Sequence, residues 1–344
     1  MRKREKSLVR SLKPREWPLA DQLAWNDVRR AHGRLTLGGS AAHLSITTQD
    51  DLAKRYGLFL DHVRRVSGKL DAIGAPAPFV MSEHVHSYIA ELRKRVSSVT
   101  LHGSIAKLRR MAELLKSDAD FGWLSEIEND LALDMIPASK FDRIIETDRI
   151  VLAGLALMEE AKLTITRTRL QRAQNYRNGL MIALLAMCPI RLKNLSSLTI
   201  GKNFVKIGEG WCIALNAKET KERRPDERPV PTRLVRYVDT YLKTYRPAFG
   251  DFGQQLWLGR DGPLTYHSVE RIVTDMTLTT LGISISPHLF RSCAASTAYM
   301  HGNDFPHLAT ALLNHRGSKT TQDHYVRSRS SFYCEEYGKL LDNI

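Results

Sequence analysis

The C-terminal third of the sequence places a histidine and an arginine three residues apart, His288 and Arg291. Ser286 is a suitable helix cap and Pro287 suits the first helical position, so the pair is expected at the start of a helix. Residues three apart on a helix lie on the same face. An imidazole can transfer a proton and a guanidinium can hold an anion with parallel hydrogen bonds, so this face has groups that could act on a phosphate.

Four more motifs, far apart in the sequence, carry groups that suit the same chemistry. Pro189-Ile-Arg191 follows a long apolar run, and Ala217-Lys-Glu-Thr-Lys221 lies in a polar stretch. Leu313-Asn-His315 and Thr320-Thr-Gln-Asp-His-Tyr325 come further on. An arginine neutralises phosphate charge, a lysine can protonate a leaving oxygen, and a phenol can be a nucleophile. Each residue alone is commonplace in a folded protein, so only their joint order and spacing are informative.

The order Arg, Lys, His-x-x-Arg, His, Tyr resembles the tyrosine recombinase family, the phage-type integrases, over about residues 176–327. The resemblance implies that Tyr325 attacks the scissile phosphate and becomes joined to its 3′ side. It further implies that Arg191 and Arg291 clamp the phosphate and that His315 donates a hydrogen bond to a non-bridging oxygen. Guanidinium groups suit the clamp because each can bind bidentately, which a lysine cannot do as well.

Two further roles follow from the resemblance, and one of them has two candidates. Lys221 would protonate the departing 5′ oxygen, and His288 would assist proton transfer to and from the tyrosine. Lys221 follows Thr220, as in the family's frequent Thr-Lys form, whereas Lys218 fits the form with two lysines three residues apart. We favour Lys221 and keep Lys218 as the alternative. Because the phosphotyrosyl link conserves the energy of the broken bond, the family chemistry implies no metal ion and no other cofactor.

Two positions depart from the family pattern. Asn194 stands where an acid usually orients the first arginine, and an asparagine can still accept a hydrogen bond. Asn314 stands where a glycine usually precedes the histidine, and asparagine tolerates left-handed backbone geometry. Tyr333 and Tyr337 are rival nucleophiles by position, but neither follows a Thr-Thr pair. We therefore keep Tyr325 as the predicted nucleophile.

The elements that must position these residues are mostly helical. An apolar helix from Tyr176 to Met187 precedes the first arginine, and helical patterns resume from Leu234 to the end. Between them, two apolar runs flank Gly208-Glu-Gly210, which is a hairpin signal, and 228–231 suits a third strand. The sequence thus predicts a mainly α fold with a small antiparallel β-sheet (α+β). A last helix over 331–341 is expected to pack on a neighbouring subunit or, alternatively, on its own domain.

The length of 344 residues suggests two domains. Residues 1–46 are predicted to be a basic N-terminal extension with one short helix. Residues 47–164 are predicted to be an all-helical domain, in the place where the family carries its core-binding, DNA-contacting domain. Residues 165–344 are predicted to be the catalytic tyrosine recombinase domain. The helices of the middle domain are expected to begin near these residues: Thr48, Ser82, Thr100, Gly122 and Ser139.

The net charge of +14 predicts a polyanionic partner, and the resemblance makes that partner double-stranded DNA. Basic residues cluster in the first part of the helical domain, whereas acidic residues collect at 118–160, a stretch that should face away from phosphate. We predict that eight cations of the helical domain contact DNA: Lys54, Arg64, Arg65, Arg93, Arg95, Lys107, Arg109 and Arg110.

Several other classes of protein are disfavoured by composition. The longest apolar run, 179–190, is shorter than the ~20 residues that a membrane span needs. The basic N-terminus lacks the apolar stretch of a secretory signal. The 4 cysteines are far apart and form no Cys-x-x-Cys pair, which disfavours a zinc site and a disulfide framework. We expect a cytoplasmic, nucleoid-associated protein with no membrane partner.

The leading interpretation is a site-specific DNA recombinase, an integrase of a mobile element. The family joins two duplexes with four active sites, which implies a homotetramer on DNA and leaves room for accessory DNA-bending proteins or a second recombinase. The alternatives are DNA relaxation of the type IB topoisomerase kind and a DNA-binding regulator without catalysis. The helical segment before the catalytic set favours recombination over relaxation, and the complete set of candidate residues argues against the regulator.

Overall fold

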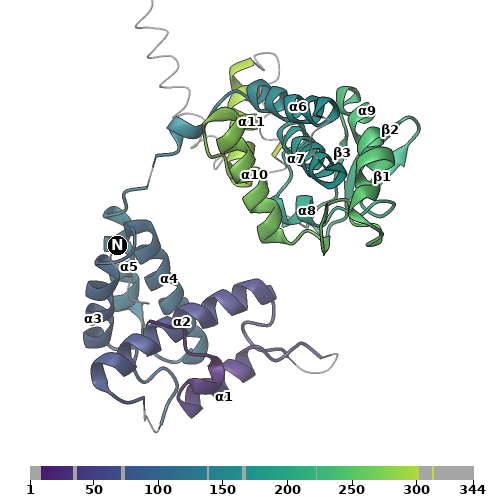
Figure 1. The fold of residues 1–344 in the computed structure, drawn as a ribbon. Coiled ribbons are helices and arrows are strands. Elements are labelled where there is room, and N and C mark those ends of the chain that lie inside the picture. The colour runs from purple at the N-terminus through teal and green to yellow at the C-terminus, as the bar shows by residue number, and fades with distance from the viewer. Residues whose placement is uncertain are drawn as a thin grey trace, which may run out of the picture. The chain divides into compact units, whose positions relative to one another are not determined.

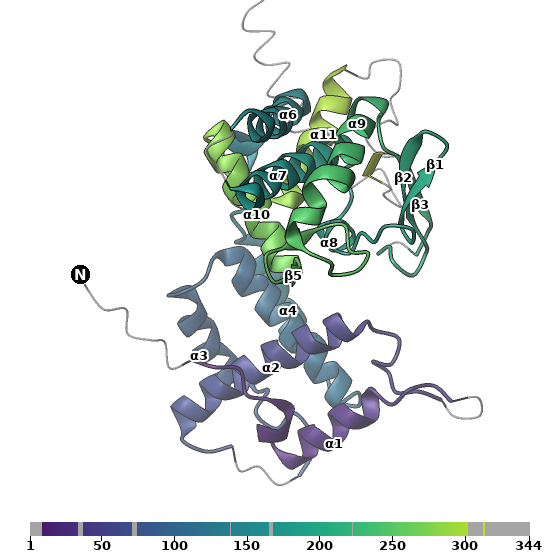
Figure 2. The same cartoon turned by 45° about the vertical axis from the view of Figure 1, so that its right-hand side comes forward.

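The computed structural model describes residues 9–33, 37–70, 74–137, 139–164, 168–221, 223–301 and 312–313. The chain forms two compact units, residues 1–138 and 139–344 (Figure 1). We predicted the boundary at 164/165, and the observed division lies earlier. The reason is that α6 (Thr147–Leu163) packs along α7 (Arg169–Met187) in the second unit, as Figure 2 shows.

The described part of the first unit has helices and no strands, and its helices begin close to the predicted residues. Ser45 caps α2 by accepting a hydrogen bond from the backbone N–H of Thr48, so the helix begins two residues before the expected start. Ser97 caps α4 in the same way. The helices of this unit are α1 (Leu19–Val28), α2 (Ile46–Ser67), α3 (Ser82–Arg93), α4 (Ser98–Leu115) and α5 (Gly122–Leu133).

The described part of the predicted extension is not an appendage but part of the first unit. Leu12, Trp17 and Trp25 are buried in its core together with side chains of α2. The backbone N–H of Leu12 donates to the carbonyl of Gly57 on α2 at 3.1 Å. A side chain at Gly57 would collide with the Leu12 carbonyl, so the chain can cross the helix here only because the residue is glycine. The extension predicted for 1–46 is corrected accordingly from Val9 onward.

The second unit combines helices with a three-stranded antiparallel sheet, which agrees with the predicted α+β fold. Gly154 of α6 and Gly179 of α7 meet at the contact between these helices, where any side chain would strike the opposite backbone. The remaining helical elements are the short turns Phe141–Arg143, Tyr241–Tyr245 and Arg246–Phe249, with α8 (Leu192–Ser196), α9 (Thr232–Thr240), α10 (Tyr266–Leu281) and α11 (Pro287–His301).

The predicted hairpin is present, and its third strand begins two residues earlier than expected. In β1 (Phe204–Ile207) and β2 (Gly210–Leu215), Phe204 lies opposite Ile213, and β3 (Asp226–Pro229) pairs with the other edge of β2. Phe204 and Trp211 stack at 5.0 Å between ring centroids and join the core. A separate two-stranded ribbon consists of β4 (Leu258–Gly259) and β5 (Gly262–Pro263).

Candidate active site

Arg191 lies between the end of α7 and the start of α8. Helix α7 is buried from Tyr176 to Ala186, and it ends at Met187 because Pro189 cannot continue the helical hydrogen bonding. Arg191 then adopts an extended backbone conformation as the N-cap residue of α8. Asn194, which stands in place of the usual acid, is buried one turn later, and its N–H donates to the Arg191 carbonyl at 2.9 Å. The position of Asn194 is thus set by the same short helix.

The predicted helix with His288 and Arg291 is α11, and it begins at Pro287 as expected. The carbonyl of Ser286 accepts hydrogen bonds from Leu289 and Phe290 in the first turn. Leu289 and Phe290 are buried in the core, which turns His288 outward, where it is exposed. Arg291 is buried, with 6 % of its surface exposed. The two residues therefore share a helix but occupy different environments.

Arg291 joins two of the predicted motifs through their backbones. Its Nη1 donates to the carbonyl of Pro189, two residues before Arg191. Its Nη2 donates to the carbonyl of Leu313 at 2.7 Å, two residues before His315. Charge-assisted hydrogen bonds to buried carbonyls are strong, so this guanidinium ties together three segments that are distant in the sequence.

The two candidate lysines lie on the connection between β2 and β3. Both Lys218 and Lys221 are exposed at their side chains. Thr220 between them is buried, and its hydroxyl bonds to the backbone N–H and carbonyl of Arg224 at 3.1 and 2.7 Å. Arg223 has a left-handed backbone conformation, φ 53°, which lets the connection turn back toward β3. The backbone under both lysines is therefore held, while their side chains reach solvent.

Two predicted catalytic residues, His315 and Tyr325, lie outside the described residues. The same is true of Asn314, of the rival tyrosines at 333 and 337, and of the helix expected over 331–341. The structure thus places Arg191, His288 and Arg291 around the junction of α7, α8 and α11. It places Lys221 on the connection between β2 and β3.

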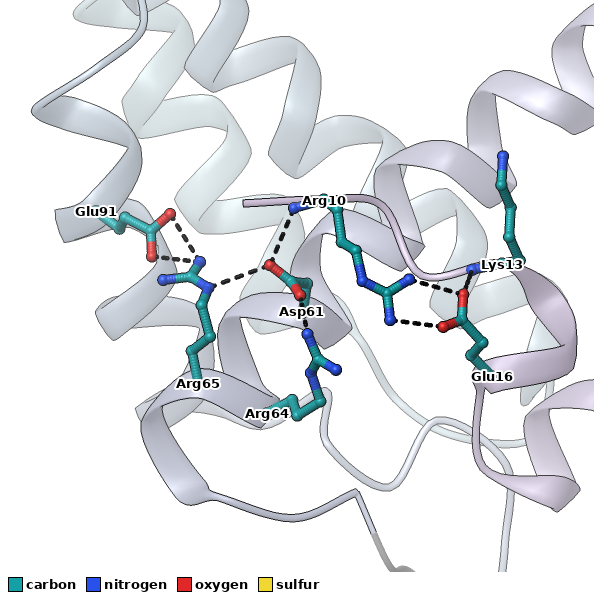
Figure 3. A network of polar contacts seen from close by, with 7 residues as sticks. All are labelled: Arg10, Lys13, Glu16, Asp61, Arg64, Arg65 and Glu91. Atoms are coloured by element: carbon teal, nitrogen blue, oxygen red, sulfur yellow. Dashed lines mark hydrogen bonds and ion pairs between the residues drawn. The ribbon is translucent and has the colours of Figure 1, made fainter. Parts of the chain in front are cut away.

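In the first unit, most of the predicted DNA-contacting cations are engaged by acids. Arg64 and Arg65 both bind the fully buried Asp61, at 2.7 and 3.1 Å, and Arg65 also binds Glu91 at 2.8 Å (Figure 3). Arg95 binds the same Glu91 at 3.3 Å. Three of the eight predicted contacts thus belong to one network of ion pairs, which lowers the net positive charge that they present.

The remaining predicted cations lie mainly on α4. Lys107 pairs with Asp51 of α2, whereas Arg109 binds Glu113 and Glu128, both at 2.6 Å. Three of the eight have no ion pair among the described residues: Lys54, Arg93 and Arg110. The acidic segment 118–160 thus contributes at least one carboxylate, that of Glu128, to the basic face of α4.

Arg55 is a cation that our list of contacts omitted. It lies 3.7 Å from Asp51 and donates to the hydroxyl of Ser104 on α4 at 3.2 Å, in the same area as Lys107. Its side chain is 29 % exposed. The signal in the sequence was its position four residues after Asp51, the spacing of an ion pair on one helix face.

Burial controls the titration of Cys188, which lies three residues before Arg191. Burial raises the pKa of Cys188, which directly precedes Pro189, to about 12, so this thiol stays protonated and unreactive at neutral pH. Among the described residues, no three His, Cys, Asp or Glu side chains gather closely enough to hold a metal ion. The described helices also include none that is long and apolar enough to cross a bilayer.

A shallow polar hollow between α6 and α9 contains none of the predicted site residues. It is lined by Glu159, Lys162, Arg236, Tyr237 and Thr240. Lys162 and Arg236 lie 5.1 and 4.8 Å from the centre of the Tyr237 ring. Lys162 is also paired with Glu159, so the charges of this hollow are largely satisfied among its own residues.

Comparisons with known proteins found similarities in sequence and in fold. The sequence profile described as the phage integrase family matches residues 156–331. The crystal structure of XerH site-specific recombinase bound to difH substrate in a pre-cleavage complex is similar in fold, with a TM-score of 0.56 and 12 % identity over 91 % of this chain and 94 % of that chain. The crystal structure of XerA recombinase aligns with a TM-score of 0.40 and 15 % identity, over 86 % and 94 % of the two chains. No curated protein matches the sequence.

Proposed function

The chain belongs to the phage integrase family, the tyrosine recombinases, and on that premise we propose that it cleaves and rejoins DNA at a specific site through a 3′-phosphotyrosyl intermediate. The observation that best supports this proposal is the pair of hydrogen bonds from Arg291 to the carbonyls of Pro189 and Leu313. These bonds join the helix that carries Arg291 to Pro189 and to Leu313, each two residues before a predicted site residue. This supports a common site for three of the family's motifs.

The proposed reaction is a transesterification at phosphorus. The Tyr325 oxygen attacks the scissile phosphate, a bond forms between that oxygen and phosphorus, and the bond to the 5′ oxygen breaks. His288 assists removal of the phenol proton, and Lys221 gives a proton to the departing 5′ oxygen. Arg191, Arg291 and His315 stabilise the negative charge that develops on the phosphate. Rejoining runs through the same steps in reverse with a new 5′ hydroxyl.

No step in this scheme needs a metal ion, because guanidinium and imidazole groups take over charge neutralisation and a lysine takes over acid catalysis. The partner is double-stranded DNA, bound by the basic surface of the first unit and by the catalytic unit. Joining two duplexes requires four active sites, so the active species is a homotetramer on DNA, with accessory DNA-bending proteins or a second recombinase as further partners. Solved relatives with this fold include XerH bound to its difH substrate.

The test is to trap the intermediate on a nicked suicide substrate in the presence of EDTA. We expect a covalent complex that gel electrophoresis detects and that protease treatment shortens, formed only with DNA carrying the element's own recombination site. Relaxation of any supercoiled plasmid without such a site would instead indicate an activity of the topoisomerase IB kind. Binding without any covalent complex would indicate a regulator.

A further inference from the structure

A buried asparagine just before β1 contacts the loop that carries the two candidate lysines. Asn203 directly precedes β1 and is 2 % exposed. Its Oδ1 accepts a hydrogen bond from the backbone N–H of Thr199 at 2.7 Å, and its Nδ2 donates to Oε1 of Glu219 at 3.0 Å. Glu219 lies sixteen residues further along, between Lys218 and Lys221. The contact therefore reaches from the start of the sheet to the loop after β2.

The second carboxylate oxygen of Glu219 is also engaged. Oε2 accepts the backbone N–H of Asn216 at 3.0 Å, and the side chain of Asn216 accepts the N–H of Lys218 at 3.0 Å. Both oxygens of Glu219 thus accept from different donors, one in the turn before β1 and one at the start of the loop. Together with the Thr220 hydroxyl bonded to Arg224, these contacts hold the backbone on both sides of Lys221.

The other end of this chain of contacts leads to Arg191. Thr199 follows α8 by three residues, and Asn203 Nδ2 also donates to the carbonyl of Ser197, the C-cap residue of α8, at 3.5 Å. Arg191 is the N-cap residue of the same helix. Asn203 therefore couples the short helix that Arg191 caps to the loop of Lys221 through side-chain hydrogen bonds in a buried position.

We propose that Asn203 and Glu219 are positioning residues that hold Lys221 in register with Arg191 for the cleavage step. This inference rests on the proposed function, in which Lys221 protonates the leaving 5′ oxygen. A lysine has a flexible four-carbon stem, so the placement of its ammonium group depends on how firmly its backbone is held. Misplacement of a catalytic group by about 1 Å can cost about 10²-fold in rate, which makes the loop anchor matter for catalysis.

The hydrogen bond from Asn203 to Glu219 can be tested selectively, because its donor and acceptor can be exchanged. Glu219→Gln keeps the size of the side chain but provides only one acceptor oxygen for two donors, so one contact is lost. Asn203→Asp faces the Glu219 carboxylate with a second carboxylate and breaks the contact from the other side. Combining Asn203→Asp with Glu219→Gln reverses the polarity of the pair and restores a donor opposite an acceptor. The matched control is Glu209→Gln, which removes one negative charge from the exposed turn between β1 and β2.

The experiment measures single-turnover cleavage by the full chain on two suicide substrates. One has an ordinary phosphate, and the other has sulfur in place of the 5′ bridging oxygen, which leaves as a thiolate and needs no protonation. We expect each single variant to cleave the ordinary substrate at least about 10-fold more slowly than the wild type and to approach the wild-type rate on the sulfur substrate. The double variant should recover most of the rate on the ordinary substrate, and Glu209→Gln should match the wild type on both.

Three outcomes would overturn the inference, and they can be told apart. If the sulfur substrate rescues Lys221→Ala but neither Asn203→Asp nor Glu219→Gln, the positioning role alone is wrong. The same holds if these two single variants cleave the ordinary substrate at the wild-type rate. If Lys221→Ala itself is not rescued, Lys221 is not the acid, and both its proposed role and the inference fall. Recovery in the double variant excludes general unfolding as the cause, because a structural defect from two changes would add rather than cancel.

Discussion

The Nη2 atom of Arg291 on α11 donates a hydrogen bond to the backbone carbonyl of Leu313 at 2.7 Å, and both residues are buried. The other terminal nitrogen of the same guanidinium donates to Pro189. A side chain that the family resemblance assigns to the phosphate is thus also a structural link between motifs. Substitutions of Arg291 will therefore act on the placement of its neighbours as well as on the charge at the phosphate.

For Arg291→Lys we expect a less stable protein and slower cleavage. A single ammonium group cannot span both carbonyls as the planar guanidinium does, so one buried carbonyl loses its donor, at a cost of about 1–3 kcal/mol. Urea unfolding and single-turnover cleavage measure the two effects. Arg233→Lys on the exposed side of α9 is the control. An Arg291→Lys protein as stable as the wild type would show that the two carbonyls do not depend on this side chain.

Tyr325→Phe should bind the recombination site with unchanged affinity and form no covalent complex, because only the phenolic oxygen is removed. Trapping on the nicked suicide substrate, followed by denaturing gel electrophoresis, checks this. Tyr333→Phe is the matched control and should still form the complex. A protease-sensitive adduct formed by Tyr325→Phe would move the nucleophile to another tyrosine.

Neighbouring arginines on α4 should differ in their contribution to DNA binding, if α4 faces the DNA as proposed. Arg110 is exposed and has no ion pair among the described residues, whereas Arg109 is held by Glu113 and Glu128. The DNA-binding constant K falls with salt, and removal of one phosphate contact makes the slope of log K against log salt less steep by about 0.9. We expect that decrease for Arg110→Gln and a smaller one for Arg109→Gln, measured by titrations between about 50 and 200 mM salt. Unchanged slopes in both variants would place α4 away from the phosphates.

Gly179→Ala should destabilise the second unit. A methyl group at this position would lie 2.6 Å from the carbonyl oxygen of Gly154 and 2.9 Å from Cβ of Leu157, so α6 and α7 would have to separate. Overpacking of this kind costs about 1–3 kcal/mol. Gly103→Ala on α4 meets no atom within 4 Å and should instead stabilise its helix by up to about 1 kcal/mol. Chemical denaturation of both variants compares them, and equal effects would contradict the close helix contact.

The stability contributed by Glu91 should depend on pH. Burial alone would raise the pKa of Glu91, but hydrogen bonds from His62 and Arg65 outweigh burial and hold the pKa below its usual range. A carboxylate with a lowered pKa in the folded state contributes stability above its unfolded pKa of about 4.3, and loses it as pH falls through the folded value. The difference in unfolding free energy between the wild type and Glu91→Gln should therefore be largest near neutral pH and shrink below about pH 4.

The control for this measurement is Glu126→Gln on α5, an exposed position where we expect little change at any pH. A wild-type advantage over Glu91→Gln that persists unchanged at low pH would show that the ion pairs of Glu91 do not titrate with its carboxylate.

Much of the candidate site was determined by local sequence. Pro189 ends α7, Pro287 begins α11, and the two glycines at 208 and 210 turn the β1–β2 hairpin. All three features were predicted, because proline restricts its own backbone and glycine allows conformations that other residues avoid. The family motifs added the chemical roles of the side chains. In the first unit the helix starts were displaced by at most two residues, as at α2, because Ser45 and Thr48 are both able to cap and only the fold selects between them. Helix α7 begins at Arg169, seven residues before the predicted start at Tyr176.

The tertiary structure alone decided which groups meet. The positive charge of α2 and α3 was visible in the sequence, but the pairing of Arg65 with Glu91, twenty-six residues away, was not. The links from Arg291 to two backbone carbonyls and from Asn203 to Glu219 were equally hidden. Periodicity and capping follow from the conformation of neighbouring residues, whereas these contacts follow from how whole elements pack, and a backbone carbonyl carries no sequence signal of the donor that will reach it.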